Sequence, residues 1–305
     1  MNHEMSRMME STTEPYEAGY LKILDHLVKK ARATGFQDRR NNSRCVSIPH
    51  VSMTYNMTEG KLPLLTTKRV PFKSVKVELE FFLKGLTDKK WLQDRNCTIW
   101  DSWCNPQKVT LTDDMSKEDR IAAQTAEMDL GPIYGAQWRD FNGQGIDQIA
   151  QIVKTLKENP ADRRMVCSAW NPAQLDQMAL PPCHMSFGLQ YIDGMLHLHW
   201  TQRSADWFLG VPFNMASYAL LLHLFCKQSG IPPGIVTGTF LDAHIYDNHL
   251  DAAEEQLSRK HDGFQFPRYL TTPLDGTFDI FNWTYNDTTI DGYSSHDKIK
   301  ADVHV

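Results

Sequence analysis

Reactive side chains are concentrated between residues 180 and 218. This stretch begins Leu-Pro-Pro-Cys-His, where two prolines stiffen the chain just before Cys183. It also contains polar side chains that an apolar core would not tolerate unpaired: Arg203, Ser204, Asp206 and Asn214. The stretch therefore predicts a reaction site, and the rest of the chain is expected to support it.

Cys183 is the candidate nucleophile. A lone cysteine after Pro-Pro is more often a core residue, and the adjacent His184 is not expected to activate it. Neighbouring residues in an extended segment point to opposite sides, which separates the thiol from that imidazole. A guanidinium group near the thiol would stabilise the thiolate, which is the attacking species. Arg203 is the nearest candidate in the sequence.

The other polar groups divide into an anion site and a site for a flat polar molecule. Four arginines suit a phosphate: Arg40, Arg163, Arg164 and Arg203. The carboxamide of Asn214 can donate and accept on one edge, as the paired N–H and C=O of uracil require, whereas cytosine would call for an acid. His244 and Tyr246 face the same side of an extended piece, where they either hold a sugar hydroxyl or form a satisfied core pair.

Hydrophobic periodicity predicts the elements that position these residues. Helices are expected at 16–33, 74–86, 146–156 and 252–257, with a buried central helix at 211–229. Strands are expected at 46–55, 165–170, 237–240 and 278–285, with a hairpin around Asp193-Gly194. Glu78 stands beside the apolar stripe of its helix, so it is either a snorkelling edge residue or a buried acid with a raised pKa. The predicted class is mixed α+β.

Length and composition favour one catalytic domain. With 305 residues, 41% of them hydrophobic, and no Pro/Gly/Ser-rich linker, the chain predicts a single domain at 16–305 after a loose lead-in at 1–15. Residues 104–129 predict a mobile surface insertion. The net charge of −5 disfavours a general nucleic-acid or membrane-surface role. Six cysteines without a CxxC pair predict reduced thiols in a cytoplasmic protein, or in a host cytoplasm for a viral one.

The chain closely resembles the folate-dependent thymidylate synthase family from about Tyr20 to Val305. The resemblance rests on collinear motifs: Leu-Leu-Thr-Thr-Lys68, Glu78 in its helix, Thr-Ile-Trp100-Asp, Leu-Gly-Pro-Ile-Tyr134-Gly-Ala-Gln-Trp-Arg, Asp162-Arg-Arg, Ser168-Ala-Trp-Asn-Pro, Leu-Pro-Pro-Cys183-His, Gln202-Arg-Ser-Ala-Asp206, Gly210-Val-Pro-Phe-Asn214-Met-Ala-Ser-Tyr218 and Asp242-Ala-His244-Ile-Tyr246. It implies a thymidylate synthase-like fold, in which a mixed sheet packs with helices and one sheet face forms a homodimer interface.

The resemblance also implies the chemistry. Cys183 would add to C6 of dUMP, and C5 would then attack the one-carbon unit of 5,10-methylenetetrahydrofolate, without a metal. Glu78 and Tyr134 would manage proton transfer. The implied nucleotide-binding residues are Arg40, Arg203, Gln202, Ser204, Asn214, His244 and Tyr246, with Arg163 and Arg164 from the other subunit. The implied folate-binding residues are Lys68, Trp100, Trp103, Asp206, Gly210, Tyr293 and His304.

The chain departs from the family pattern around the phosphate and the C-terminus. The family's Arg-Thr-Gly-Thr-Gly-Thr loop is Arg40-Asn-Asn-Ser-Arg-Cys here, so Arg39 or Arg44 is an alternative phosphate ligand, and the loop is also typical of a solvated surface. Leu241 replaces a glycine, Ser294-Ser-His296-Asp replaces Pro-His-Pro, and His304 stands where alanine is common.

The departures leave more than one activity open. Hydride transfer to the exocyclic methylene gives dTMP, and addition of water gives 5-hydroxymethyl-dUMP. Exclusion of water by Trp100 and Trp103 favours hydride, whereas His304 could orient a water molecule. Thymidylate synthase is the preferred interpretation and a dUMP hydroxymethylase the main alternative. Weaker alternatives are use of dCMP and a relative that binds a nucleotide or RNA without turnover.

Overall fold

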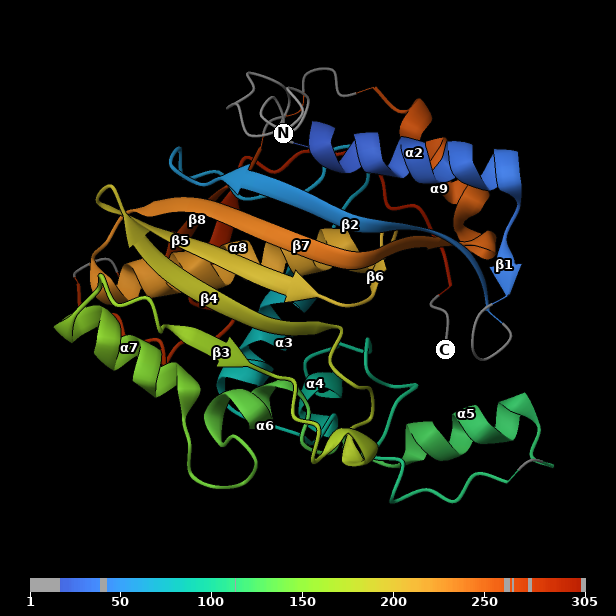
Figure 1. Ribbon diagram of the computed structural model, residues 1–305, viewed down its shortest axis with the longest axis horizontal. Helices are drawn as coiled ribbons and strands as arrows, with labels where there is room; N and C mark the ends of the chain where they lie inside the picture. Colours follow the sequence, from blue (N-terminus) through green and yellow to red (C-terminus); the bar gives the residue numbers. More distant parts are fainter. Residues whose placement is uncertain are drawn as a thin grey trace.

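A mixed β-sheet forms the centre of the computed structural model, which describes residues 17–38, 43–112, 114–260, 264, 266–273 and 276–302 (Figure 1). Seven strands form this sheet in the order β1-β2-β7-β5-β4-β3, with β6 paired to β7. Their bounds are β1 Gln37–Asp38, β2 Arg44–Asn56, β3 Val166–Ser168, β4 His184–Ile192, β5 Met195–Gln202, β6 Ala205–Asp206 and β7 Pro233–Tyr246. The expected hairpin at Asp193-Gly194 is confirmed, since β4 and β5 pair antiparallel around it.

The long strand β7 connects the two halves of the sheet. It runs antiparallel to β2 from Cys45↔Tyr246 to Asn56↔Ile235, and parallel to β5 and β6 on its other side. The sequence predicted only residues 237–240 of this strand, because Gly, Asp and His interrupt the apolar pattern outside that core. The parallel pairing with β6 places Asp206 opposite His244, so two predicted site residues become neighbours.

Helix α8, Gly210–Ser229, is the apolar centre of the fold. Twelve of its 20 residues are buried, and it packs against β5, β7 and α3. It ends at Gly230, whose φ of 73° is the left-handed conformation that glycine adopts without strain. The prediction of a buried central helix is therefore confirmed, and its second turn carries Asn214.

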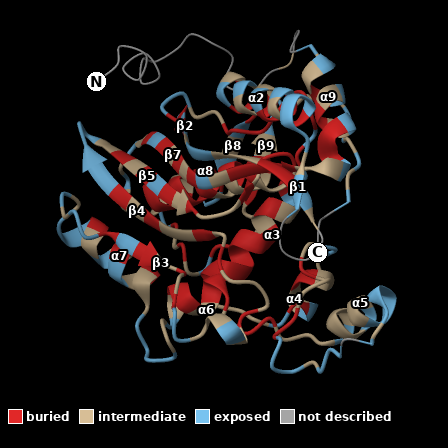
Figure 2. Cartoon of the chain, turned by 45° about the vertical axis from the view of Figure 1, so that its right-hand side comes forward, coloured by how far each residue is buried: buried red, intermediate tan, exposed pale blue. Residues whose placement is uncertain are grey.

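The other helices pack against the sheet or against one another, with one exception that projects from the edge of the molecule. Their bounds are α2 Ala18–Thr34, α3 Phe72–Leu83, α4 Lys90–Gln93, α5 Lys117–Ala126, α6 Tyr134–Arg139, α7 Gln148–Glu158 and α9 Leu250–Ser258, with 3-10 turns at Leu175–Gln177 and Asp247–His249. Most of α3 is buried, whereas α5 carries no buried residue (Figure 2). Among the described helices, none is long and apolar enough to cross a bilayer.

Two segments differ from the sequence predictions. The expected strand at 278–285 is wrong: this segment forms turns, in which the Asp279 and Asp287 side chains accept hydrogen bonds from nearby backbone N–H groups. The strand follows later as β9, Thr288–Asp291, paired with β8, Arg268–Thr271. Within the expected insertion at 104–129, the structure contains helix α5, whose N-cap Ser116 accepts from the backbone N–H of Asp119.

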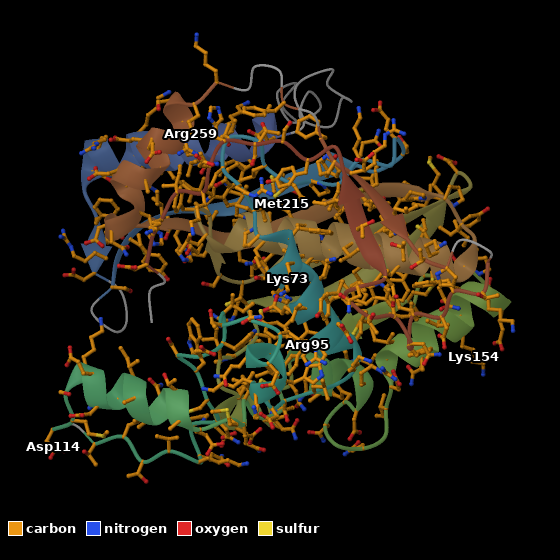
Figure 3. The ribbon with its side chains drawn as sticks, turned by 180° about the vertical axis from the view of Figure 1, so that it is seen from behind. Lys73, Arg95, Asp114, Lys154, Met215 and Arg259 are labelled. Atoms are coloured by element: carbon orange, nitrogen blue, oxygen red, sulfur yellow. The ribbon has the colours of Figure 1, made fainter. Side chains whose placement is uncertain are left out.

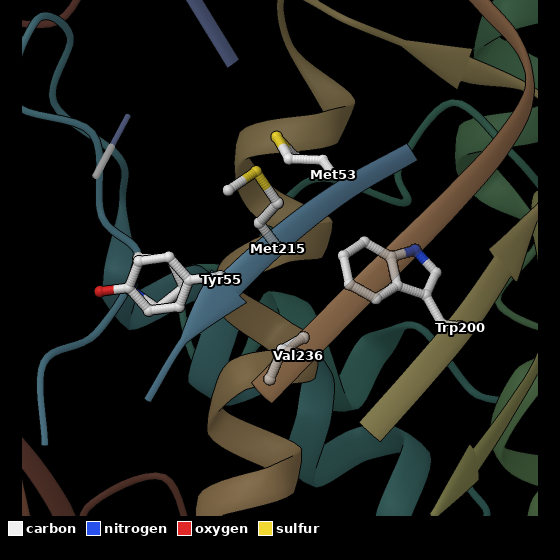
Figure 4. A pocket seen from close by; sticks show the side chains of 6 residues that line it. Met53, Tyr55, Trp200, Met215 and Val236 are labelled. Atoms are coloured by element: carbon white, nitrogen blue, oxygen red, sulfur yellow. The ribbon is translucent and has the colours of Figure 1, made fainter. Parts of the chain in front are cut away.

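A small cavity lies under the sheet, where β2, β5, β7 and α8 meet (Figure 4). Its volume is about 10 Å³, and its lining is Met53, Tyr55, Pro63, Trp200, Met215 and Val236. An apolar void of this size has room for about one water molecule and offers it few polar partners. It is a packing defect of the core rather than a binding site.

Candidate active site

Cys183 and Arg203 are adjacent because their strands are paired. Cys183 immediately precedes β4 and Arg203 immediately follows β5, and the first residue of β4 pairs with the last residue of β5. The backbone N–H of Arg203 donates to the Cys183 carbonyl at 2.8 Å, and its Nη2 lies 3.9 Å from the Cys183 Sγ. The guanidinium also donates to the carbonyls of Pro182 and Pro181, at 3.0 and 2.7 Å. The Pro-Pro segment thus holds the cation beside the thiol.

The pKa of the Cys183 thiol reflects two opposing influences. Burial raises it, while Arg203 and the Tyr134 hydroxyl lower it, and burial has the larger effect. The expectation that Arg203 favours the thiolate is correct in direction. In this chain by itself, however, the guanidinium does not offset the full cost of burying the thiolate.

The imidazole of His184 is held by two tyrosine side chains. Its Nδ1 is 2.8 Å from the Tyr218 hydroxyl, and its ring stacks on Tyr134 with centroids 4.0 Å apart. Burial lowers its pKa to about 3, so the imidazole is neutral at physiological pH. The prediction that His184 does not activate Cys183 agrees with these contacts. Tyr134 instead accepts a hydrogen bond from the Cys183 backbone N–H at 2.8 Å.

Glu78 is a buried acid, which decides between the two alternatives left open for it. Its side chain is only 7% exposed and accepts a hydrogen bond from Trp100 Nε1 at 2.8 Å. Burial raises its pKa to about 7, although the bond from Trp100 lowers it. A carboxyl group with a pKa near neutrality can both take up and release a proton, as a general acid–base group must.

A hydrogen-bonded amide pair lies at the start of α8. Gln202 Nε2 donates to Asn214 Oδ1 at 3.1 Å and to the Ser204 carbonyl at 2.9 Å. This arrangement directs the Asn214 Nδ2 away from Gln202, where it can donate to a ligand. Nearby, Asp206 Oδ1 accepts from the backbone N–H groups of Phe208 and Leu209, at 3.0 and 3.1 Å. Asp206 thereby shapes the turn that leads to Gly210.

A group of imidazole and phenol rings follows Asp206 across the β6–β7 pairing. The rings of His244 and Tyr246 are 5.0 Å apart, which confirms that they face the same side of β7. His249 was missed by the sequence interpretation. It is fully buried, its Nδ1 lies 3.8 Å from Asp206 Oδ1, and its Nε2 lies 2.8 Å from the Asp302 carbonyl. It therefore connects the C-terminal segment to Asp206.

Comparison with protein-family models shows which family this chain belongs to. The family model described as Thymidylate synthase matches residues 18–305. The chain belongs to the thymidylate synthase family. Members of this family are one-carbon transferases that use 5,10-methylenetetrahydrofolate as co-substrate, and membership supports one-carbon transfer to dUMP at the family level. In the described part of the chain, no group of three or more His, Cys, Asp or Glu residues could hold a metal ion.

Lys68 lies beside Asp206 at the edge of this candidate site. Its Nζ donates to the Phe208 carbonyl and lies 3.6 Å from the centre of the Phe208 ring. Burial lowers its pKa to about 7, although Asp206 opposes that shift. The preceding backbone N–H groups of Thr66 and Thr67 donate to the buried carboxylate of Glu17. Glu17 was missed, since nothing in its local sequence indicates a partner that lies 49 residues away.

Tyr293 belongs to a basic groove next to this edge. Its hydroxyl donates to the Leu65 carbonyl at 2.8 Å and accepts from the Val70 backbone N–H at 3.0 Å. The groove has a volume of about 420 Å³ and is lined by Arg69, Val70, Pro71, Phe72, Lys73, Lys76, Thr289, Ile290 and Tyr293. Tyr293 therefore anchors the C-terminal region to the segment that carries Lys68.

The predicted phosphate ligands are divided in space. Arg203 is at the thiol, whereas Arg163 and Arg164 are exposed in the turn before β3, where Arg164 pairs with Asp162 at 2.8 Å. Arg44 lies at the start of β2, and its Nε is 3.5 Å from Asp38 Oδ1. Three sequence-based candidates, Arg39, Arg40 and His304, fall outside the residues that the structure describes.

Proposed function

We propose that this enzyme transfers the one-carbon unit of 5,10-methylenetetrahydrofolate to C5 of dUMP and releases dTMP. The observation that carries the proposal is the contact of Cys183 with the Arg203 guanidinium at 3.9 Å. One cation in that position can attract both a thiolate and the phosphate of a bound nucleotide. The carboxyl group of Glu78, whose pKa is raised to about 7, supplies the acid–base group that the same reaction needs.

The first step is addition of the Cys183 thiolate to C6 of the pyrimidine. A carbon–sulfur bond forms, the C5–C6 π electrons move toward C5 and O4, and C5 becomes nucleophilic. Burial keeps the thiol protonated in the isolated chain, so nearby positive charge is required for attack. Arg203 supplies part of that charge, and Arg163 and Arg164 of a second subunit supply the rest together with Arg40.

Recognition of uracil is assigned to the amide pair at the start of α8. Because Asn214 Oδ1 already accepts from Gln202, its Nδ2 is directed to donate to O4 of the base. A second lone pair on Oδ1 remains available for the N3–H of uracil. Cytosine carries a donor at the O4 position and no proton on N3, so this orientation disfavours dCMP. Ser204 is assigned to the phosphate, and His244 and Tyr246 to the sugar hydroxyl.

Proton movement is assigned to Glu78 and Tyr134. A carboxyl with a pKa of about 7 can donate toward O4 as C6 is attacked and can accept a proton after carbon–carbon bond formation at C5. Tyr134 keeps its proton, because burial raises its pKa well above the ordinary value. Its hydroxyl fixes the Cys183 backbone and places a donor beside the reaction site.

The residues around Asp206 fit the folate co-substrate. The carboxylate suits the N–H edge of a flat heterocycle, and the indoles of Trp100 and Trp103, 6.1 Å apart, suit its faces. Lys68 and Tyr293 add polar groups at the outer edge, with Gly210 and His304 assigned to the same ligand. When bound, the folate supplies the one-carbon unit and the hydride. Trp100 and Trp103 limit access of water to the methylene that receives the hydride.

Two features support a homodimer in a reducing compartment. Arg163 and Arg164 are exposed in a turn before β3 rather than turned toward Cys183, which is the placement expected of residues that serve a second subunit. All six cysteines are free thiols. Such cysteine usage is typical of the cytoplasm.

Product analysis tests the proposal. Incubation of the enzyme with dUMP and 5,10-methylenetetrahydrofolate is expected to yield dTMP and dihydrofolate in equal amounts. Formation of 5-hydroxymethyl-dUMP with tetrahydrofolate would instead establish a hydroxymethylase. A parallel reaction with dCMP tests the assignment of Asn214. If wild-type protein and Cys183→Ser both bind dUMP and neither produces a modified nucleotide, the chain is a non-catalytic binding protein.

A further inference from the structure

Lys89 is a fully buried lysine that the proposed reaction does not use. Its side chain is 0% exposed, and it lies in the turn between α3 and α4. A buried ammonium group is costly unless each of its three N–H donors has an acceptor. Lys89 Nζ donates to three backbone carbonyls: Asp101 at 2.9 Å, Trp103 at 2.8 Å and Gln124 at 2.7 Å.

The three carbonyls come from two segments with different roles. Asp101 and Trp103 belong to the turn that carries the two indoles assigned to folate. Gln124 lies in the last turn of α5, which projects at the edge of the molecule near Asp114 (Figure 3). Because α5 buries none of its own side chains, its position depends on contacts such as the bond from Lys89.

The two ends of the insertion, residues 104–129, meet near the same lysine. The Lys89 backbone N–H donates to Met128 O at 2.9 Å, and the backbone N–H of Asn105 donates to Asp129 O at 2.7 Å. Lys108 pairs with the Asp129 carboxylate at 2.9 Å. Both ends of residues 104–129 therefore return to the residues around Lys89.

We propose that Lys89 is a positioning residue, through which the 104–129 insertion holds Trp100 against Glu78 and Trp103 beside Trp100, and shapes the folate side of the site. The inference rests on the proposed function, because it takes the two indoles as folate contacts. Lys89 acts through backbone carbonyls and touches no substrate. Its loss would leave the carbonyls of three half-buried residues without this donor, so the Trp100 turn would shift and its bond to Glu78 would weaken.

The test compares Lys89→Met with Lys90→Met. Methionine keeps most of the lysine volume without the charge, and Lys90 is an exposed neighbour that pairs with Asp94, so its variant is a matched control. Lys89→Met is expected to raise the KM for methylenetetrahydrofolate about 10-fold and to leave the Kd for dUMP unchanged. Lys90→Met is expected to match wild type in both constants.

The pH profile separates this role from simple loss of stability. The Trp100 bond lowers the pKa of Glu78, so weakening that bond should move the Glu78-dependent limb of kcat/KM to higher pH in Lys89→Met. Hydrogen exchange should also quicken in residues 98–103 and 117–126 together. A folded Lys89→Met enzyme with the wild-type folate KM and the wild-type pH limb would overturn the proposal.

A second variant covers the case in which Lys89→Met does not fold. Gln124→Pro disturbs the last turn of α5, which contributes nothing to the core, and leaves Lys89 in place. It is expected to raise the folate KM and to quicken exchange in residues 98–103, and unchanged values of both would contradict the proposal. If the wild-type protein has no activity, the proposed function fails, and exchange in residues 98–103 still decides whether Lys89 positions the Trp100 turn.

Discussion

The thiol of Cys183 is controlled by one cation and by burial, and these influences can be separated. Arg203 lowers the pKa of the thiol, so Arg203→Met should raise that pKa further and slow alkylation of Cys183 at pH 8. The rate of modification by iodoacetamide, followed by mass spectrometry of the Cys183 peptide, measures this. Arg95→Met, which removes a guanidinium 3.6 Å above the Trp91 ring, is the control and should leave the rate unchanged. Equal rates in wild type and Arg203→Met would refute the assigned influence.

Titration of the Glu78 carboxyl group is expected to change the free energy of unfolding. Its folded-state pKa of about 7 lies above the ordinary value of 4.5, so the folded protein holds this proton more tightly than the unfolded chain does. The stabilisation is complete below pH 4.5 and is lost as the pH rises through 7. The loss amounts to about 3 kcal/mol between pH 4.5 and 8.

Glu78→Gln tests this linkage. The variant should lose less unfolding free energy than wild type between pH 5 and 8, because glutamine does not titrate. Its kcat should fall at least 100-fold, because the proposed proton-transfer group is lost. Urea denaturation at several pH values and steady-state kinetics measure the two effects. Parallel stability curves for the two proteins would show that Glu78 titrates as an ordinary exposed carboxyl.

At the scale of elements, the close crossing of α3 and α6 places Tyr134 beside the Glu78 helix. A Cβ on Gly135 would lie 2.7 Å from the Phe82 carbonyl oxygen and 2.8 Å from its Cα. Gly135→Ala should therefore push the helices apart, cost about 1–3 kcal/mol of unfolding free energy and displace the Tyr134 hydroxyl from the Cys183 N–H. Gly210→Ala is the control, since its nearest neighbour would be Asp206 Cβ at 3.6 Å. Thermal unfolding that ranks the two variants in the opposite order would contradict this account.

The sequence predicted those helices whose buried face appears as a regular spacing of apolar residues. Helices α2, α3, α7 and α8 fall near the expected ranges, because their apolar residues recur with the helical period. The failure at 278–285 has a local cause: its aromatic residues resemble a strand, but Asp279 and Asp287 bind backbone N–H groups and stabilise turns instead.

The site was predictable where motifs are dense and unpredictable where contacts are long-range. Cys183 and Arg203 could be linked from the sequence, and their strands do bring them together. Glu17, Lys89 and His249 were missed because each binds a backbone group far along the chain or contributed by another element. A single glutamate, lysine or histidine in the sequence carries no mark of such a partner, since a backbone carbonyl or N–H is present at nearly every position.

At the scale of the whole molecule, one face of the central sheet is suited to a second subunit. Along β7, the partly or fully exposed residues Ile235, Thr237, Thr239 and Leu241 alternate with buried ones. Val166 on β3 is 57% exposed beside the turn that carries Arg163 and Arg164. A two-fold dimer through this face would bury apolar side chains and would carry the two arginines toward the partner.

Subunit complementation tests that arrangement. Cys183→Ser and the Arg163→Ala/Arg164→Ala double variant should each be nearly inactive alone. If the arginines serve the partner's phosphate, a mixed dimer contains one site with an intact Cys183 from one chain and intact arginines from the other. Random exchange of equal amounts should then restore roughly a quarter of wild-type activity, because half of the dimers are mixed and each has one intact site. If the arginines instead served the site of their own chain, every site in the mixture would carry a defect. Activity would then stay at the level of the separate variants, and a dimer seen by light scattering would not share its sites.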